Sequence, residues 1–330
     1  FISVNNGYQV AVMAPTDVLA SQHFEGFKNI FDKLNIKCVF LSGNQKAKEK
    51  KENYTLIQSG EAKIIIGTHA IIQDKVIFKN LGVVITDEQH RFGVKQREIL
   101  SKKGKNPHTL VMTATPIPRT LALILYGDLD ISIIDKLPPG RQKIETIYVN
   151  STYYNRLYDF IKKNANEKRQ SYIICRMIDE NEKLELKSVL SYTEQLKNEI
   201  FKNYSVECIH GKMKNVEKQN IMNKFYNGEI DILISTTVIE VGINVPNATI
   251  MIIENAERFG ISQLHQLRGR VGRGSEKSYC ILVSDSKNNQ SKQRLNTMVK
   301  YSDGFILSEK DLEIRGTGDF FGTRQHGIPD

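Results

Sequence analysis

The sequence predicts an α/β protein in which two doubly wound parallel sheets follow one another along the chain. The chain has 330 residues, of which 40% are hydrophobic and 25% charged, and this suits two domains better than one core. Short apolar segments alternate with amphipathic ones, as strands alternate with helices in a parallel sheet. The alternation stops at the Pro- and Gly-containing segment 136–141 and then resumes. We therefore expect a first domain over 1–140 and a second over 141–285.

The elements of the first domain follow from its apolar runs. We expect strands near 10–14, 38–41, 64–66, 83–86 and 110–112, with helices over about 18–34 and through residue 54. In the second domain we expect strands near 144–149, 171–175, 206–209 and 230–235, with helices near 152–164, 186–202 and 216–226. Strands and helices of similar length thus recur, which predicts a second sheet and not an extension of the first.

Two adjacent carboxylates, Asp87 and Glu88, end the apolar run that starts at Val83. A strand buried on both faces would deliver them to the carboxyl edge of its sheet, where parallel α/β proteins bind ligands. Carboxylate oxygens suit Mg²⁺, so Asp87 can hold the metal through water while Glu88 polarises an attacking water. The spelling of 87–90 is that of a Walker B motif. The alternative is a strand that ends in two solvated acids.

Three further turns follow expected strands and open towards the same edge. At 14–16 and 67–69, small and hydroxyl residues can bring backbone amides close to a phosphate. At 113–115, the hydroxyls suit sensing the group that the neighbouring acids hold and passing its state along the sheet. Each of them alone would be an ordinary connection between a strand and a helix, or a Ser/Thr-rich turn. Together with the acids they form a row of polar groups.

The segment 263–274 holds three arginines separated by glycines, which are poor helix formers. Closely set guanidinium groups can reach a γ-phosphate as arginine fingers, and we assign this role to Arg270 and Arg273.

Charge and cysteine content limit the classes of function. A net charge of +9 favours a polyanionic partner. The four cysteines form no Cys-x-x-Cys pair, which indicates core thiols in a reducing compartment, and no Cys/His cluster predicts a zinc site. No apolar run approaches the roughly 18 residues that span a bilayer, and the first residues have no signal-peptide features. We expect a cytoplasmic protein without a membrane partner.

Six motifs in order resemble those of superfamily-two helicases. They are Ala14-Pro15-Thr16, Gly67-Thr68-His69, Asp87-Glu88-Gln89-His90, Thr113-Ala114-Thr115, the turn 236–242, and Gln266-x-x-Gly269-Arg270-x-Gly272-Arg273. Within that superfamily, 87–97, 112–121, 128–141 and the tail from Asp311 to Gln325 resemble the RecG family of branched-DNA helicases. The resemblance implies two RecA-like domains, and it implies a translocation motif over 286–330 that consists of a helical hairpin and a loop.

The resemblance also implies roles for individual residues, with ATP and Mg²⁺ as cofactors. Catalytic roles fall on Asp87, Glu88, Gln89, His90, Gln266, Arg270 and Arg273. The residues implied to contact the nucleotide are Asp87, Glu88, Arg270, Arg273, Gly242 and Asn244, and those implied to bind the metal are Asp87 and Glu88. DNA contact or coupling falls on Pro15, Thr16, Gly67, Thr68, His69, Thr113, Thr115, Thr236, Thr237, Arg315, Arg324 and Gln325. The implied partners are double-stranded and branched DNA and a single-stranded-DNA-binding protein, with the helicase acting as a monomer in repair and recombination.

Two departures from the family pattern matter. The phosphate-binding loop Gly-x-x-x-x-Gly-Lys-Ser/Thr does not occur in these 330 residues. The family places that loop just before the position of Phe1, so we expect a fragment that also lacks the amino-terminal wedge domain and is inactive alone. Asn244 stands where the family usually has aspartate, so it keeps an acceptor but loses a charge.

Two other functions stay open at this point. The transcription-repair coupling factor Mfd shares the tail and 113–121, although 87–90 and 137–141 look more like RecG. The chain would also fit a DNA-binding module without ATP turnover of its own.

Overall fold

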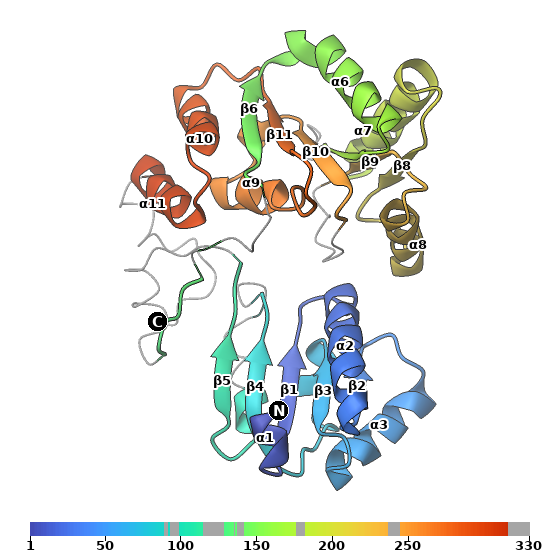
Figure 1. Cartoon of the computed structure of the whole chain (residues 1–330), viewed down its shortest axis with the longest axis vertical. Coiled ribbons are helices and arrows are strands. Elements are labelled where there is room, and N and C mark those ends of the chain that lie inside the picture. Colours follow the sequence, from blue (N-terminus) through green and yellow to red (C-terminus); the bar gives the residue numbers. More distant parts are fainter. Residues whose placement is uncertain are drawn as a thin grey trace. The chain divides into compact units, whose positions relative to one another are not determined.

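The computed structural model describes residues 1–88, 92, 99–114, 129–134, 136, 142–175, 182–236 and 245–315, with the backbone alone at 182–187, 215 and 315. It contains two compact units, each built around its own parallel sheet (Figure 1). This confirms the two tandem doubly wound domains. The boundaries at 140 and 285 stay predictions.

The first unit holds a five-stranded sheet whose strands all run parallel. Its order is β2-β3-β1-β4-β5, so β1 lies at the centre between β3 and β4. Every residue of β1 and β3 is buried, as expected of strands covered on both faces. The strands are β1 (Gln9–Met13), β2 (Cys38–Leu41), β3 (Ile64–Gly67), β4 (Leu81–Thr86) and β5 (His108–Val111).

The α-helices of the first unit whose bounds are described are α1 (Ile2–Asn5), α2 (Asp17–Phe31) and α3 (Ala47–Ser59). Helix α2 begins after its N-cap Thr16, whose hydroxyl oxygen accepts a hydrogen bond from the Leu19 amide at 3.3 Å. It packs against β2 and β3. The expected helix over 18–34 is thus α2 followed by one 3₁₀ turn, Asp32–Leu34. Helix α3 ends at Ser59, before Gly60 in the left-handed conformation (φ 78°).

The second unit holds a six-stranded parallel sheet in the order β6-β11-β10-β7-β9-β8. Its strands are β6 (Glu145–Val149), β7 (Gln170–Ile174), β8 (Val206–Ile209), β9 (Ile232–Ser235), β10 (Ala248–Ile253) and β11 (Tyr279–Val283). Strands β10 and β11 were not among those expected from the sequence, although all six residues of β10 are buried. The helices between the strands are α6 (Tyr154–Asn166), α7 (Glu182–Gln195), α8 (Asn215–Tyr226) and α9 (Ile261–Arg268).

Between β11 and residue 315, the structure describes two helices. Helix α10 (Asn289–Lys300) packs against β6, α9 and α11, and α11 (Gly304–Arg315) packs against α9 as well (Figure 1). They occupy the place of the expected helical hairpin. Within the described ranges, no helix is both long and apolar enough to cross a lipid bilayer.

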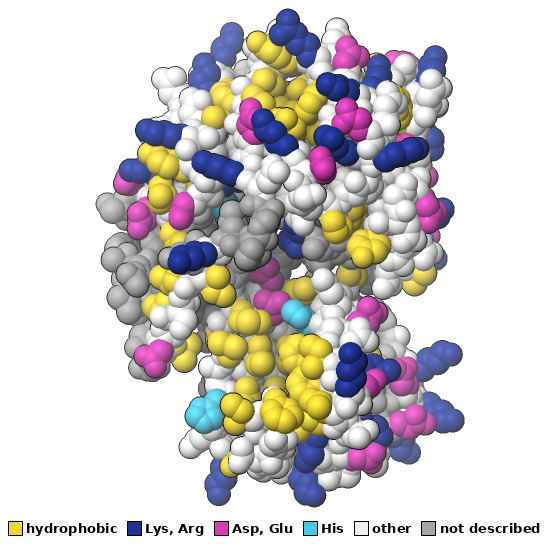
Figure 2. All heavy atoms as spheres, in the orientation of Figure 1, with side chains coloured by type: hydrophobic (Ala, Val, Ile, Leu, Met, Phe, Trp, Pro, Cys, Tyr) yellow, Lys and Arg dark blue, Asp and Glu magenta, His cyan; other side chains and the backbone are white. Residues whose placement is uncertain are grey.

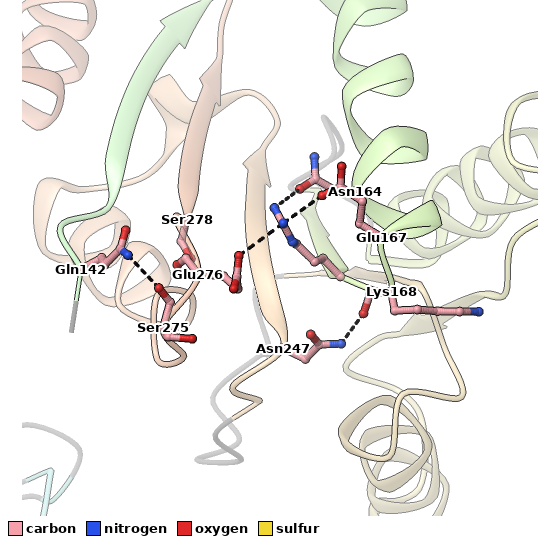
Figure 3. A network of polar contacts seen from close by, with 9 residues as sticks. Gln142, Asn164, Glu167, Lys168, Asn247, Ser275, Glu276 and Ser278 are labelled. Atoms are coloured by element: carbon pink, nitrogen blue, oxygen red, sulfur yellow. Dashed lines mark hydrogen bonds and ion pairs between the residues drawn. The ribbon is translucent and has the colours of Figure 1, made fainter. Parts of the chain in front are cut away.

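A polar network joins segments that precede four strands of the second sheet (Figure 3). Arg169 forms ion pairs with Glu167 at 2.9 Å and Glu276 at 3.3 Å. The network also contains the hydrogen bonds Gln142 Nε2 to Ser275 O at 2.7 Å, Arg169 Nη1 to Asn164 Oδ1 at 3.5 Å and Asn247 Nδ2 to Lys168 O at 2.5 Å. These residues lie at the amino ends of the strands. Since parallel sheets bind ligands at the opposite edge, we assign this network a structural role.

Candidate functional site

The strands of the first sheet end level with one another. Met13 pairs with Gly67 on one side and with Thr86 on the other, and Thr86 pairs with Val111. The four polar turns therefore leave the same edge of the sheet, as the sequence predicts. Chain connections run in opposite directions from β1 and β4, so the crevice outside these two strands is the topological switch point at which such folds bind ligands.

Asp87 lies at that switch point, directly after β4. Its amide donates to the Met13 carbonyl of β1 at 2.9 Å, which ties it to the end of the central strand. One carboxylate oxygen, Oδ1, accepts the Glu88 amide at 2.9 Å, and the other, Oδ2, lies 2.8 Å from Nε2 of His23 on α2. The Asp87 side chain keeps 19% of its surface exposed. It is therefore held from two sides while still open to a ligand.

Glu88 adopts a left-handed backbone conformation, with φ at 49°. This region is uncommon for residues other than glycine, and such strain gathers at functional sites. Both Asp87 and Glu88 are partly exposed. Carboxylate oxygens are hard ligands and suit Mg²⁺, which is usually held by one or two carboxylates together with substrate phosphates. The donor set at 87–88 therefore fits the metal that the sequence predicts.

The other turns of this edge have different environments. A Cβ on Gly67 would lie 1.9 Å from the Leu41 carbonyl oxygen, so only glycine fits there. Thr68 is 2% exposed, and its hydroxyl has no hydrogen-bond partner among the described residues. His69 and Thr113 are exposed, whereas Pro15 and Thr16 are half-buried. His69 and Thr113 are thus open to solvent, whereas Thr68 is not.

The arginine segment of the second unit starts on helix α9 and leaves it at the first glycine. The helix ends at Arg268. Gly272 has a left-handed backbone with φ at 71°, and a Cβ at this position would lie 2.7 Å from Cγ1 of Ile144. Arg270 is half-buried and Arg273 exposed, and the Arg273 Nε donates to the Gly269 carbonyl at 3.1 Å. Burial raises the pKa of Tyr172 on β7, and the nearby charges of both arginines oppose that rise.

Arg268 differs from the other two arginines because it is only 4% exposed. Its guanidinium donates to the carbonyls of Met298 and Tyr301 at 3.0 Å each and to that of Ser302 at 2.9 Å. The ring Nδ1 of His265 lies 2.9 Å from Nη2. Burial, followed by the charge of Arg268, lowers the pKa of His265 to about 4, so this nitrogen accepts the bond at neutral pH.

Arg268 was not expected to be a structural residue, yet its buried position has a signal in the sequence. Ile261, Leu264 and Arg268 recur at helical spacing and share one buried face of α9. His23 carries no comparable signal, because a lone histidine on a helix is most often a surface or core residue.

A buried carboxyl group, Glu254, follows β10 at the carboxyl edge of the second sheet and is 6% exposed. It accepts a hydrogen bond from the Tyr192 hydroxyl of α7, and the Cys175 Sγ lies 3.8 Å away. Burial raises the pKa of Glu254 from 4.5 to about 7, and the bonds from Tyr192 and Cys175 offset part of the rise. Glu254 was not among the site residues expected from the sequence.

The remaining expected site residues are described in part or not at all. Gln266 is half-buried on α9, and Thr236 is half-buried with its amide donating to Ile209 O at 3.2 Å. The backbone of Arg315 closes α11, and its side chain lies outside the described part of the chain. Also outside it lie Gln89, His90, Thr115, Thr237, Gly242, Asn244, Arg324 and Gln325.

Basic side chains are scattered over both units in the view of Figure 2 and form no single stripe there. Hydrophobic side chains gather on the first unit in the same view. The exposed large hydrophobic residues of that unit include Tyr8 at 43% and Leu110 at 51%. Although the chain has a net charge of +9, the Lys and Arg side chains visible on this face do not mark a DNA interface.

Comparison with known proteins gives a consistent family. Residues 2–124 match the DEAD/DEAH box helicase model, and residues 152–275 match the helicase conserved C-terminal domain. The chain is 49% identical to the ATP-dependent DNA helicase RecG of Synechocystis over 99% of its length and 48% identical to that of Bacillus subtilis over 100%. It spans 40% and 48% of the lengths of these two relatives, respectively.

A solved structure of RecG bound to a three-way DNA junction superposes with a TM-score of 0.78 at 44% identity, covering 98% of this chain and 42% of that one. The relatives named here are RecG proteins and not coupling factors, so they give the Mfd-like alternative no support. The chain therefore belongs to the RecG family of superfamily-two helicases.

Proposed function

We propose that the full-length protein is an ATP-dependent translocase on double-stranded DNA that remodels branched DNA, such as stalled forks and Holliday junctions, in recombination and repair. The observation that best supports this is the carboxylate pair at the β1/β4 switch point, in a chain 44% identical to a RecG that binds a three-way junction. Its cofactors would be ATP and Mg²⁺. It would act in the cytoplasm as a monomer and bind a single-stranded-DNA-binding protein.

The first unit would carry the acid–base chemistry. Asp87 and Glu88 would hold the metal, and Glu88 would accept the proton of the attacking water, with Gln89 and His90 assisting. A bound Mg²⁺ supplies charge neutralisation at the transferred phosphoryl group. Asp87 suits its role because both of its oxygens are fixed by donors while the side chain stays partly exposed.

The second unit would carry the positive charge that stabilises the transition state. Arg270 and Arg273 would donate to the γ-phosphate, with Gln266 beside them, and Gly242 and Asn244 would complete the nucleotide contacts. The ion-pair network of Figure 3, at the amino ends of the strands of the second sheet, would keep that sheet rigid while the arginines act at the opposite edge.

DNA would be held mainly through its phosphates. The contacts fall on Pro15, Thr16, Gly67, Thr68, His69, Thr113, Thr115, Thr236 and Thr237, and the tail with Arg315, Arg324 and Gln325 would turn hydrolysis into movement. Binding of this kind is independent of sequence and weakens steeply with salt.

The test compares ATPase and unwinding in the full-length protein. We expect ATP hydrolysis to be stimulated by duplex and most strongly by three-way junctions, and junction unwinding to require ATP and Mg²⁺. Log-log plots of affinity against salt should fall linearly. ATPase that ignores DNA, or junction binding that is flat between low and physiological salt, would contradict the proposal, and binding without any turnover would favour the DNA-binding module.

A further inference from the structure

We propose that His23 is a positioning residue for Asp87. The N–H of its ring holds one carboxylate oxygen, and this would fix the orientation in which Asp87 offers its remaining lone pairs to Mg²⁺. The inference deepens the proposed ATPase function and rests on it, because both concern the same carboxylate.

The contact joins two elements that meet at the switch point. His23 lies on the second turn of α2, the helix that follows the central strand β1, and Asp87 follows the neighbouring strand β4. Nε2 lies 2.8 Å from Oδ2, within the short range of charge-assisted hydrogen bonds. The side chains are 26% and 19% exposed, so the bond is only partly open to solvent.

The chemistry of the pair fixes which atom carries the proton. An ionised carboxylate can only accept hydrogen bonds, so Nε2 must bear hydrogen whatever the charge of the ring. The bond is therefore an N–H donated by His23 to Asp87. Its direction does not depend on the protonation of Nδ1.

Two donors from different parts of the chain fix the plane of the carboxylate. The Glu88 amide holds Oδ1 at 2.9 Å, and His23 holds Oδ2. With the Glu88 amide alone, the group could still rotate about its χ angles. Groups that orient a metal-binding carboxylate from behind typically contribute 10–100-fold to metal affinity or activity.

A purely stabilising pair predicts a different outcome. Partly exposed ion pairs and hydrogen bonds contribute little to folding, so loss of His23 is expected to leave the melting temperature nearly unchanged. Metal binding and folding therefore separate the two roles.

The experiment uses the full-length protein and three variants. His23→Ala removes the donor, and His23→Gln places an amide N–H near the position of Nε2. His108→Ala is the matched control, because His108 is an exposed histidine on β5 of the same unit. For each protein we would measure binding of a fluorescent, non-hydrolysable ATP analogue against Mg²⁺ concentration, the Mg²⁺ dependence of DNA-stimulated ATPase, and thermal melting.

We expect the Mg²⁺ concentration for half-maximal binding to rise roughly 10–100-fold in His23→Ala. It should return most of the way in His23→Gln and stay at the wild-type value in His108→Ala, with melting temperatures alike in all four proteins. An unchanged Mg²⁺ dependence in His23→Ala, or a loss that His23→Gln does not restore, overturns the positioning role. If wild type shows DNA-stimulated ATPase, such a result leaves the proposed function standing. Wild type that neither binds nor hydrolyses Mg–ATP removes both.

Discussion

The guanidinium of Arg268 donates to the main-chain carbonyl of Tyr301 at 3.0 Å, across 33 positions of sequence. Tyr301 is the C-cap of α10, and the carbonyls of Met298 and Ser302 bind the same guanidinium. The last carbonyls of a helix have no partner within it, and a cation there also complements the helix dipole. One arginine thus joins the helix that leads into Arg270 and Arg273 to the hairpin α10–α11.

Replacing Arg268 should weaken the contact between α9 and the hairpin α10–α11. In Arg268→Lys, a single ammonium group cannot reach all the carbonyls that the planar fork serves, and each orphaned acceptor costs about 1–3 kcal/mol. We expect a lower melting temperature and faster hydrogen exchange over 289–315, measured by mass spectrometry. Arg156→Lys is the control, since Arg156 is exposed on α6. Unchanged exchange over 289–315 in Arg268→Lys would show that the hairpin is held by other contacts.

The buried carboxyl of Glu254 should make stability depend on pH. Its pKa is about 7 in the folded protein against 4.5 ordinarily, so between these values the folded state binds more protons than the unfolded state. The free energy of unfolding contributed by this group therefore falls as pH rises from 4.5 to 7 and is level above that.

Glu254→Gln should remove this dependence. The neutral amide cannot ionise, so at pH 8 the free energy of unfolding of the variant should exceed that of wild type by up to about 3 kcal/mol. At pH 4.5 the two proteins should have similar free energies of unfolding. Urea titrations across this pH range give the measurement, with exposed Glu229→Gln as the control. A variant with the same pH slope as wild type would assign the slope to other groups.

Glu88→Gln in the full-length protein should separate nucleotide binding from hydrolysis. The amide keeps the size of the side chain but cannot accept the proton of the attacking water. We expect ATP-analogue affinity close to wild type and loss of DNA-stimulated ATPase, measured on one preparation. Failure to bind nucleotide in a folded variant would give Glu88 a structural role instead.

Arg270→Lys and Arg273→Lys should each lower the kcat of DNA-stimulated ATPase, with ATP-analogue binding affected far less. An arginine finger contributes about 10³–10⁵ in rate, and a lysine cannot reproduce its planar geometry. Steady-state kinetics at saturating ATP and DNA give the measurement, with Arg156→Lys again as the control. Near-normal kcat in both lysine variants would reject the assignment.

Local pattern alone was enough for most of the fold. The strands at 38–41 and 206–209 have the predicted bounds, because buried parallel strands are continuous apolar runs that need no information from elsewhere in the chain. The helix expected over 186–202 was placed less well: α7 starts at Glu182 and gives way to a π-helical turn at Leu196–Ile200. Helix ends depend on the packing around them more than on propensity.

The sequence by itself determined the row of polar turns at one sheet edge and the presence of Asp87 and Glu88 within it. Parallel strands bring their carboxyl ends together whatever the details of packing. Only the tertiary structure decided which neighbours orient these groups. His23 lies 64 positions from Asp87, and Arg268 lies 30 to 34 positions from the carbonyls it binds. Such contacts arise where separate elements pack together, and no local period in the sequence encodes the partner.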